Sequence, residues 1–168
     1  MTGSFRYITD PEEILGIIEN GARACKDLEL TTFCWSATGN RMFLKPDKIP
    51  LKPIQPIHHA FGLMGKARTR KWREDLPGRT AVDVTLTTLL LDRLLYADTR
   101  FWFDCGAVFA GRGGNVGLVD IERWKNSSRE LKRTWGKSVS FTRRQFGRRH
   151  NVDSMSIQVT RSNPVAQK

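Results

Sequence analysis

The sequence predicts an α+β fold in which one N-terminal helix is followed by a mostly antiparallel β-sheet with one or two further helices. Segments with helical spacing and segments with strand alternation follow one another irregularly, which favours α+β over a regular β–α–β order. The 168 residues, 39% of them hydrophobic, suit one domain with one core. We therefore expect residues 1–168 to form a single domain.

The first helix is expected over residues 11–26. Asp10 suits the capping position, Pro11 suits the first helical position, and Glu13 has the spacing of a capping box. Apolar residues then recur with helical spacing along one face: Ile14, Leu15, Ile17, Ile18, Ala22 and Cys25.

A β-hairpin is expected next, over residues 28–45. The stretch LELTTFCWSA (28–37) is rich in β-branched and aromatic residues, TGN (38–40) is a turn signal, and RMFLK (41–45) suits a return strand. The following PDKIPLKPIQP (46–56) contains four prolines. Proline excludes a helix there and favours an extended, Pro-rich connector within the domain.

The middle of the chain is less regular. Residues 80–98 fit both helical spacing and strand alternation, and we favour a helix from about residue 83. Residues 101–111 and 115–124 have the character of two strands joined by the glycine-rich GRGG.

The last third of the chain combines a helix with strands. We expect a short helix over 126–135 that carries basic groups on one side, followed by strands at 138–141 and 155–160. In the last segment Met155, Ile157 and Val159 alternate with polar residues, as in a half-buried strand.

Charge is the strongest global signal. The net charge is +11, and residues 123–149 hold ten basic residues against the single acidic residue Glu130. Residues 66–79 add six basic residues against two acidic ones, whereas residues 1–30 hold six acidic residues against three basic ones. A surface kept only for solubility would mix the two signs, so this distribution predicts a polyanionic partner, either nucleic acid or an anionic membrane surface.

The densest basic motif is FTRRQFGRRH, residues 141–150. Paired guanidinium groups bind phosphate oxygens through bidentate hydrogen bonds, and Phe141 or Phe146 could anchor the segment or stack. Such contacts bind phosphate without selecting a base sequence. The expected anion-binding residues are Arg143, Arg144, Arg148, Arg149, Lys132, Arg133, Lys137, Arg68, Arg70, Lys71 and Arg73.

No motif indicates a cofactor or a metal centre. Cys25, Cys34 and Cys105 are odd in number and widely spaced, which predicts buried reduced thiols and neither a disulfide framework nor a zinc site. His58 and His59 are adjacent, and in an extended segment adjacent side chains point in opposite directions. We therefore expect no metal there, no cofactor, and no enzymatic activity.

A metal-dependent nuclease is the enzyme least in conflict with the sequence. Asp120 and Glu122 alternate on the expected strand at 115–124, with Lys125 nearby. Such a site would need a third carboxylate converging on a divalent cation. The sequence offers Asp83, Asp92 and Asp104 for that role.

Two segments carry a family resemblance. LELTTFCWSATGNRMF and the basic GLMGKARTRKW resemble the first core strand and the following segment of rhabdovirus matrix proteins, in particular those of plant-infecting rhabdoviruses. The resemblance implies a viral structural protein that condenses a nucleoprotein–RNA complex, binds anionic membrane and assembles with copies of itself. It places such a protein in the virion and the host cytoplasm, soluble or at most peripheral to membranes.

The opposed charges of the two ends suggest how copies could join. Glu12, Glu13 and Glu19 on the first helix would contact a basic patch of a neighbour, in a head-to-tail interaction that propagates. Two alternatives remain beside a matrix-type protein: a nucleic-acid-binding regulator or silencing suppressor without catalysis, and the nuclease.

Overall fold

The computed structural model describes residues 6–40, 44, 51–104, 121–146 and 150–158, with the backbone alone at 51, 121, 142–146 and 150–155. In chain order the elements are α1 (Pro11–Asp27), β1 (Thr32–Ser36), β2 (Leu51–Lys52), β3 (Phe61–Leu63), the 3-10 helix η1 (Gly65–Thr69), α2 (Thr80–Asp92), β4 (Tyr96–Trp102), α3 (Ile121–Trp135), the 3-10 helix η2 (Gly136–Ser138), β5 (Val139–Phe146) and β6 (His150–Ile157). The predicted α+β class, with an N-terminal helix ahead of the strands, is confirmed.

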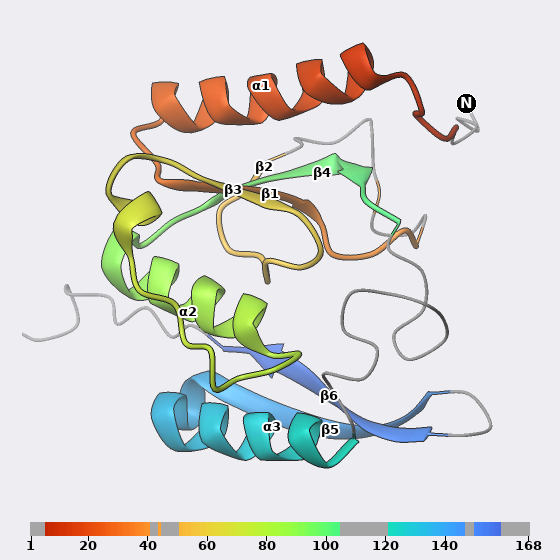
Figure 1. Cartoon of the computed structure of the whole chain (residues 1–168), viewed down its shortest axis with the longest axis vertical. Helices are drawn as coiled ribbons and strands as arrows, with labels where there is room; N and C mark the ends of the chain where they lie inside the picture. The colour runs from red at the N-terminus through yellow and green to blue at the C-terminus, as the bar shows by residue number, and fades with distance from the viewer. Residues whose placement is uncertain (1–5, 41–43, 45–50, 105–120, 147–149, 159–168) are drawn as a thin grey trace, which may run out of the picture.

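The layers are stacked along the long axis of the molecule (Figure 1). Helix α1 covers one face of a four-stranded sheet, and α2 covers the other face. The β5–β6 hairpin and α3 then pack against the far side of α2. Consequently α1 and α3 lie at opposite ends of the molecule.

Helix α1 begins where the sequence predicts. The Asp10 carboxylate accepts a hydrogen bond from the Glu12 backbone N–H at 3.2 Å, and Pro11 occupies the first turn. The side chain of Glu13 pairs with Arg6, which differs from the expected capping box. The ring of Phe33 in β1 lies between Gly21 of α1 and Gly62 of β3. It is so close to both glycines that a Cβ at either position would collide with it.

The four-stranded sheet has the order β2–β4–β1–β3. Strand β1 is central: it pairs in parallel with β4 and antiparallel with β3, while β2 pairs antiparallel with β4. The prediction that 28–45 forms a hairpin is therefore wrong, because both edges of β1 are occupied by strands from later in the chain. Leu44 is described outside any strand, and residues 41–43 and 45 are outside the described part.

The two thiols within the described ranges lie in this part of the core. Cys25 and Cys34 are buried and free, as expected, and burial raises the pKa of Cys25 to about 11 and that of Cys34 to about 12. Cys105 falls outside the described residues.

Helix α2 resolves the ambiguity of residues 80–98. A helix forms from Thr80, three residues earlier than predicted, and the chain continues into β4. Val84 and Leu89 pack toward the sheet, whereas Val82 and Leu86 pack toward α3 and β5. Because α2 is buried on both sides, it lacks the polar stripe that would have identified its period.

Helix α3 replaces part of a predicted hairpin. Residues 121–124, expected in a strand, form its first turn, and the helix predicted at 126–135 is its remainder. The strand predicted at 101–111 begins within β4, but its residues 105–111 are outside the described part. The strands predicted at 138–141 and 155–160 are present as the longer antiparallel pair β5 and β6. Strand β6 ends at Ile157, Gln158 lies outside it, and residues 159–160 are outside the described part. Among the described residues, no helix has the length and apolar character needed to cross a bilayer.

Candidate anion-binding surface on α3

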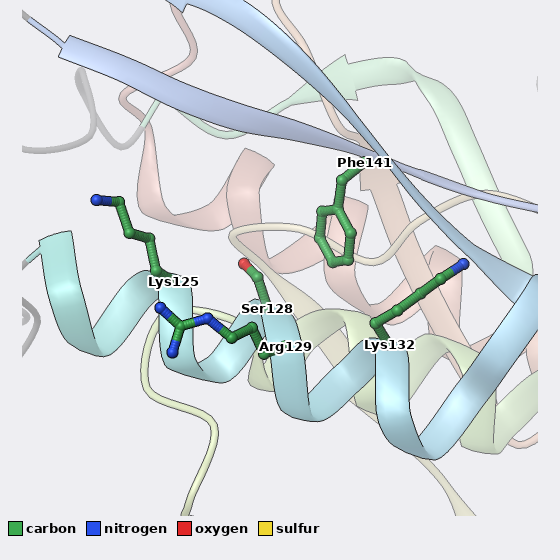
Figure 2. A pocket seen from close by; sticks show the side chains of 5 residues that line it. All are labelled: Lys125, Ser128, Arg129, Lys132 and Phe141. Carbon is green, nitrogen blue, oxygen red and sulfur yellow. The ribbon is translucent and has the colours of Figure 1, made fainter.

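Three cations lie on one side of α3 around an open hollow. Lys125, Arg129 and Lys132 are separated by four and then three residues, which places them on one face of a helix. Together with Ser128 and Phe141 they line a hollow of about 380 Å³ between α3 and β5. Figure 2 shows the Phe141 ring extending from β5 toward α3, with Lys132 on one side and Arg129 and Lys125 on the other. We call these five residues the α3 site.

The inner face of α3 is held firmly. Leu131 is fully buried and packs with Val139 of β5. The indole Nε1 of Trp135 donates to the carboxylate of Asp83 at 2.8 Å, and the Ser127 hydroxyl donates to the Pro77 carbonyl at 3.1 Å. These contacts fix the rotation of the helix, so the three cations are held on the side of the hollow.

A buried arginine lies beneath the site. The guanidinium carbon of Arg79 is 4.0 Å from the centroid of the Trp124 ring and 5.8 Å from that of Phe141. Its Nε donates to the Ser128 hydroxyl at 3.1 Å, and the side chain is almost wholly buried. Arg79 therefore links Trp124 and Ser128 of α3 to Phe141 of β5 behind the lining of the hollow.

The exposed ion pairs at the site are weak. Arg129 lies 3.3 Å and Lys125 4.0 Å from the carboxylate of Glu122, and all three side chains are at least half exposed. Such pairs contribute roughly 0–1 kcal/mol and exchange readily with another anion. A phosphate group can therefore compete with Glu122 for both cations.

Lys132 also forms hydrogen bonds at the C-terminal end of α3. Its ammonium donates to the carbonyls of Gly136 at 2.9 Å and Val139 at 2.6 Å, which satisfies acceptors just beyond the helix C-terminus. An ammonium has three N–H donors. Two of them hold the turn into β5, and the charge remains beside the hollow.

Other predicted residues on α3 and nearby face a different way. Arg133 pairs with Glu130 at 2.9 Å. Arg73 pairs with Asp75, lies 3.8 Å from Glu130, and donates to the Thr134 hydroxyl at 2.7 Å. The hydrogen bond with Asp75 raises the pKa of Arg73, and the same bond lowers the pKa of Asp75. These two arginines belong to a charge-balanced cluster, which differs from the open basic surface that was expected.

Arg70 is an interior residue. Its Nη2 lies 2.5 Å from one carboxylate oxygen of Asp92, and the same oxygen accepts a hydrogen bond from the Thr31 hydroxyl. The other carboxylate oxygen of Asp92 is 3.0 Å from Lys66 Nζ. The side chains of Arg70 and Asp92 are only 11% and 5% exposed, so this pair fastens η1 to the end of α2. The prediction that Arg70 belongs to a phosphate-binding surface is therefore wrong, because its side chain is mostly buried and paired with Asp92.

The pKa of Asp92 reflects these partners. Burial alone would raise it, but the hydrogen bonds from Thr31, Arg70 and Lys66 outweigh burial and hold the pKa below its ordinary value. The carboxylate is therefore ionised at neutral pH and compensates the charge of Arg70.

The remaining predicted cations are distributed over the molecule. Arg68 and Lys71 are exposed in and just after η1, which lies at the level of the sheet, far along the long axis from α3 (Figure 1). Lys137 is exposed in η2, directly after α3. The structure therefore places Arg68 and Lys71 away from the α3 site, although Arg73 and Arg79 of the same basic segment contact α3.

The motif FTRRQFGRRH lies on the β5–β6 hairpin. Arg143 is in register with Asp153, and Arg144 with Val152. Arg148 and Arg149 are outside the described residues. The motif thus begins at Phe141, inside the α3 site, and follows β5 away from it.

The acidic residues proposed for self-association lie on α1. Glu12 and Glu19 are exposed, while Glu13 is less exposed and pairs with Arg6. Because α1 is at the opposite end of the molecule from α3, the charge separation seen in the sequence is also a separation in space (Figure 1).

The nuclease alternative loses its geometric basis in the described part of the chain. Glu122 is on a helix and faces Lys125 and Arg129, Asp83 accepts from Trp135, and Asp92 holds Arg70. Asp120 is outside the described residues. Within those residues, no group of three or more His, Cys, Asp or Glu side chains is arranged to hold a metal ion.

The expectation that His58 and His59 point in opposite directions is wrong. Nδ1 of His58 and Nε2 of His59 are 3.3 Å apart, with ring centroids at 4.7 Å. The segment Ile57–Ala60 is not part of a strand, so the alternation rule does not apply to it.

Only part of the α3 site was predicted from the sequence. Lys132 was expected to bind anions and Phe141 to anchor the basic motif or stack, whereas Lys125, Ser128 and Arg129 were not assigned to a binding site. The available signal was the spacing of residues 125, 129 and 132, which becomes visible only when 121–135 is treated as a single helix.

Comparisons with known proteins add no relative. None of the protein-family models, curated proteins and solved structures compared with this chain matches it.

Proposed function

We propose that the protein binds nucleic acid through phosphate contacts made by the α3 site. The observation that carries this proposal is the row of Lys125, Arg129 and Lys132 along one side of a rigidly held helix, facing an open hollow. Lys125 and Arg129 form only weak, exposed ion pairs with Glu122, so a phosphate group can replace the Glu122 carboxylate as their partner. Backbone contacts of this kind give salt-dependent affinity without strong sequence preference.

The position of α3 favours nucleic acid over a membrane as the partner. A basic amphipathic helix binds a bilayer by burying its apolar face in the interface. The apolar side of α3, including Leu131, is already packed against Val139 and the residues of α2. The charged side of α3 is the side left exposed to solvent. This side suits contacts with a phosphate backbone better than insertion into the interface of a lipid bilayer.

Salt-titrated binding of fluorescently labelled RNA tests the proposal. Neutralising Lys125 and Arg129 with Lys125→Gln and Arg129→Gln should weaken binding and reduce the slope of log affinity against log salt by roughly 2. The matched control, Arg68→Gln with Lys71→Gln, removes the same charge from an exposed segment elsewhere and should leave the slope near that of the wild type.

Two outcomes would overturn the proposal. Equal losses in both double variants would mean that only the total charge matters. Binding to vesicles of phosphatidylserine and phosphatidylcholine, lost in the α3 variant, together with no binding to RNA, would identify a lipid headgroup surface instead.

A narrower proposal is a matrix-type viral assembly protein, for which the resemblance and the separation of charge along the long axis are the support. Head-to-tail contact of the acidic α1 of one copy with the basic end of another would propagate as a lattice. Glu12→Lys with Glu19→Lys should abolish self-association in light scattering at low salt, with Lys52→Glu as a charge-change control on an exposed residue of β2. If assembly were unchanged in the α1 variant, the head-to-tail contact through α1 would be rejected. If the wild-type protein did not self-associate at all, the alternative of a nucleic-acid-binding regulator would remain.

A further inference from the structure

We infer that the α3 site holds an unpaired nucleobase against Phe141, so that the protein prefers single-stranded over double-stranded nucleic acid. This inference rests on the proposed function and adds to it the form of the nucleic acid. The observation behind it is an aromatic ring at the wall of a hollow whose other walls carry three cations (Figure 2).

The chemistry of the lining suits a base and its phosphates together. The stems of Lys125, Arg129 and Lys132 are aliphatic and only their ends are charged, so the walls are apolar and the rim is cationic. A base is flat and apolar on its faces, whereas the phosphate attached to its sugar is anionic. A nucleotide can therefore place its base inside the hollow and its phosphate at the rim.

The size of the hollow sets the class of ligand. A volume of about 380 Å³ lies in the range of roughly 300–1,000 Å³ typical of small-molecule sites. A hollow of this volume has room for a single nucleobase. Bases within a duplex are stacked on one another, so only an unpaired base offers its face to Phe141.

Phe141 is positioned before a ligand arrives. It packs at the edge of the core cluster that contains Leu131 and Val139, and it lies near the buried guanidinium of Arg79. A ring held in place loses little conformational entropy when a base stacks on it. Base–aromatic stacking contributes about 1–3 kcal/mol per base.

Three labelled ligands distinguish the elements of this inference in the wild-type protein. They are a single-stranded RNA, the same RNA as a duplex, and a single strand of equal length with abasic sites, all measured at one salt concentration. The prediction is that the single strand binds roughly 5- to 150-fold more tightly than the abasic strand, from base stacking alone. Equal affinity for the base-containing and abasic strands would overturn the inference.

Substitution at Phe141 locates the effect. Phe141→Leu keeps an apolar side chain in the core but removes the ring, and should lower affinity for the single strand toward that for the abasic strand. Phe141→Tyr retains the ring and should retain the preference, and thermal unfolding verifies that both variants are folded. Stacking on Phe141 would be contradicted if Phe141→Tyr lost the preference for the base-containing strand over the abasic strand. It would also be contradicted if Phe141→Leu kept that preference.

The two proposals fail in different ways. If the protein binds none of the three ligands, or if Lys125→Gln with Arg129→Gln changes nothing, the proposed function is wrong. If the three ligands bind alike with a salt slope that falls in the α3 variant, phosphate binding stands and only the inference about the base is rejected.

Discussion

Two basic clusters that look alike in the sequence have different roles in the structure. In the η1–α2 corner, the cations Lys66 and Arg70 surround the buried carboxylate of Asp92. At the α3 site, Lys125 and Arg129 face solvent and share the exposed Glu122. The difference lies in the anion: a buried carboxylate makes its cations part of the framework, whereas an exposed one leaves them exchangeable.

The comparison shows why counting charge is insufficient. Both segments are strongly basic, yet Arg70 is 11% exposed and Arg129 is 68% exposed. Breaking a buried ion pair is costly because it leaves a charge without compensation, while breaking an exposed pair costs little. Stability should therefore depend on the first region and ligand binding on the second.

The largest expected effect is on stability in the η1–α2 corner. Asp92→Asn leaves Arg70 buried without a counter-charge and should lower the free energy of unfolding by about 3–5 kcal/mol, measured by urea denaturation. Asp75→Asn is the matched control, because it removes a carboxylate that also pairs with an arginine but is largely exposed. Similar losses in the two variants would contradict the distinction between the regions.

The same carboxylate predicts a dependence on pH. Because the pKa of Asp92 is lowered in the folded protein, its stabilisation is fully present above the unfolded value of about 3.9 and is lost as pH falls through the folded value. The difference in unfolding free energy between wild type and Asp92→Asn should therefore be constant near neutral pH and shrink in acid. A difference that grew as the pH fell would refute the assignment.

A change at the α3 site should leave folding nearly untouched. Arg129→Gln removes an exposed charge and should alter the free energy of unfolding by no more than about 0.5 kcal/mol. Its RNA affinity should fall, and the salt slope should decrease by roughly 1. Marked destabilisation would show that Arg129 belongs to the framework, as Arg70 does.

The smallest predicted effect has the opposite sign. Glu122→Gln removes the competing carboxylate beside Lys125 and Arg129, and should strengthen RNA binding by about 1 kcal/mol or less. Glu74→Gln, on an exposed residue between β3 and α2, controls for the change in net charge. Weaker binding of the Glu122 variant would mean that Glu122 orients the two cations instead of competing for them.

Local signals in the sequence predicted the elements with local causes. The Asp10–Pro11 cap places the start of α1, and the basic stretch at 126–135 is helical as expected. Predictions failed where a partner is distant: β1 pairs with β3 and β4, and Arg70 with Asp92, each pair joining separated segments. The α3 site was predicted only in part for a related reason, since Phe141 reaches it from a strand that follows the helix.

Lysine footprinting by mass spectrometry tests the central claim most directly, because both regions contain an exposed lysine. Acetylation of the protein with and without single-stranded RNA would be compared at Lys125 of the α3 site and at Lys71 near η1. We predict protection of Lys125 on binding, with Lys71 modified equally in both samples. Protection of Lys71 while Lys125 remained fully reactive would contradict the assignment of nucleic-acid binding to α3.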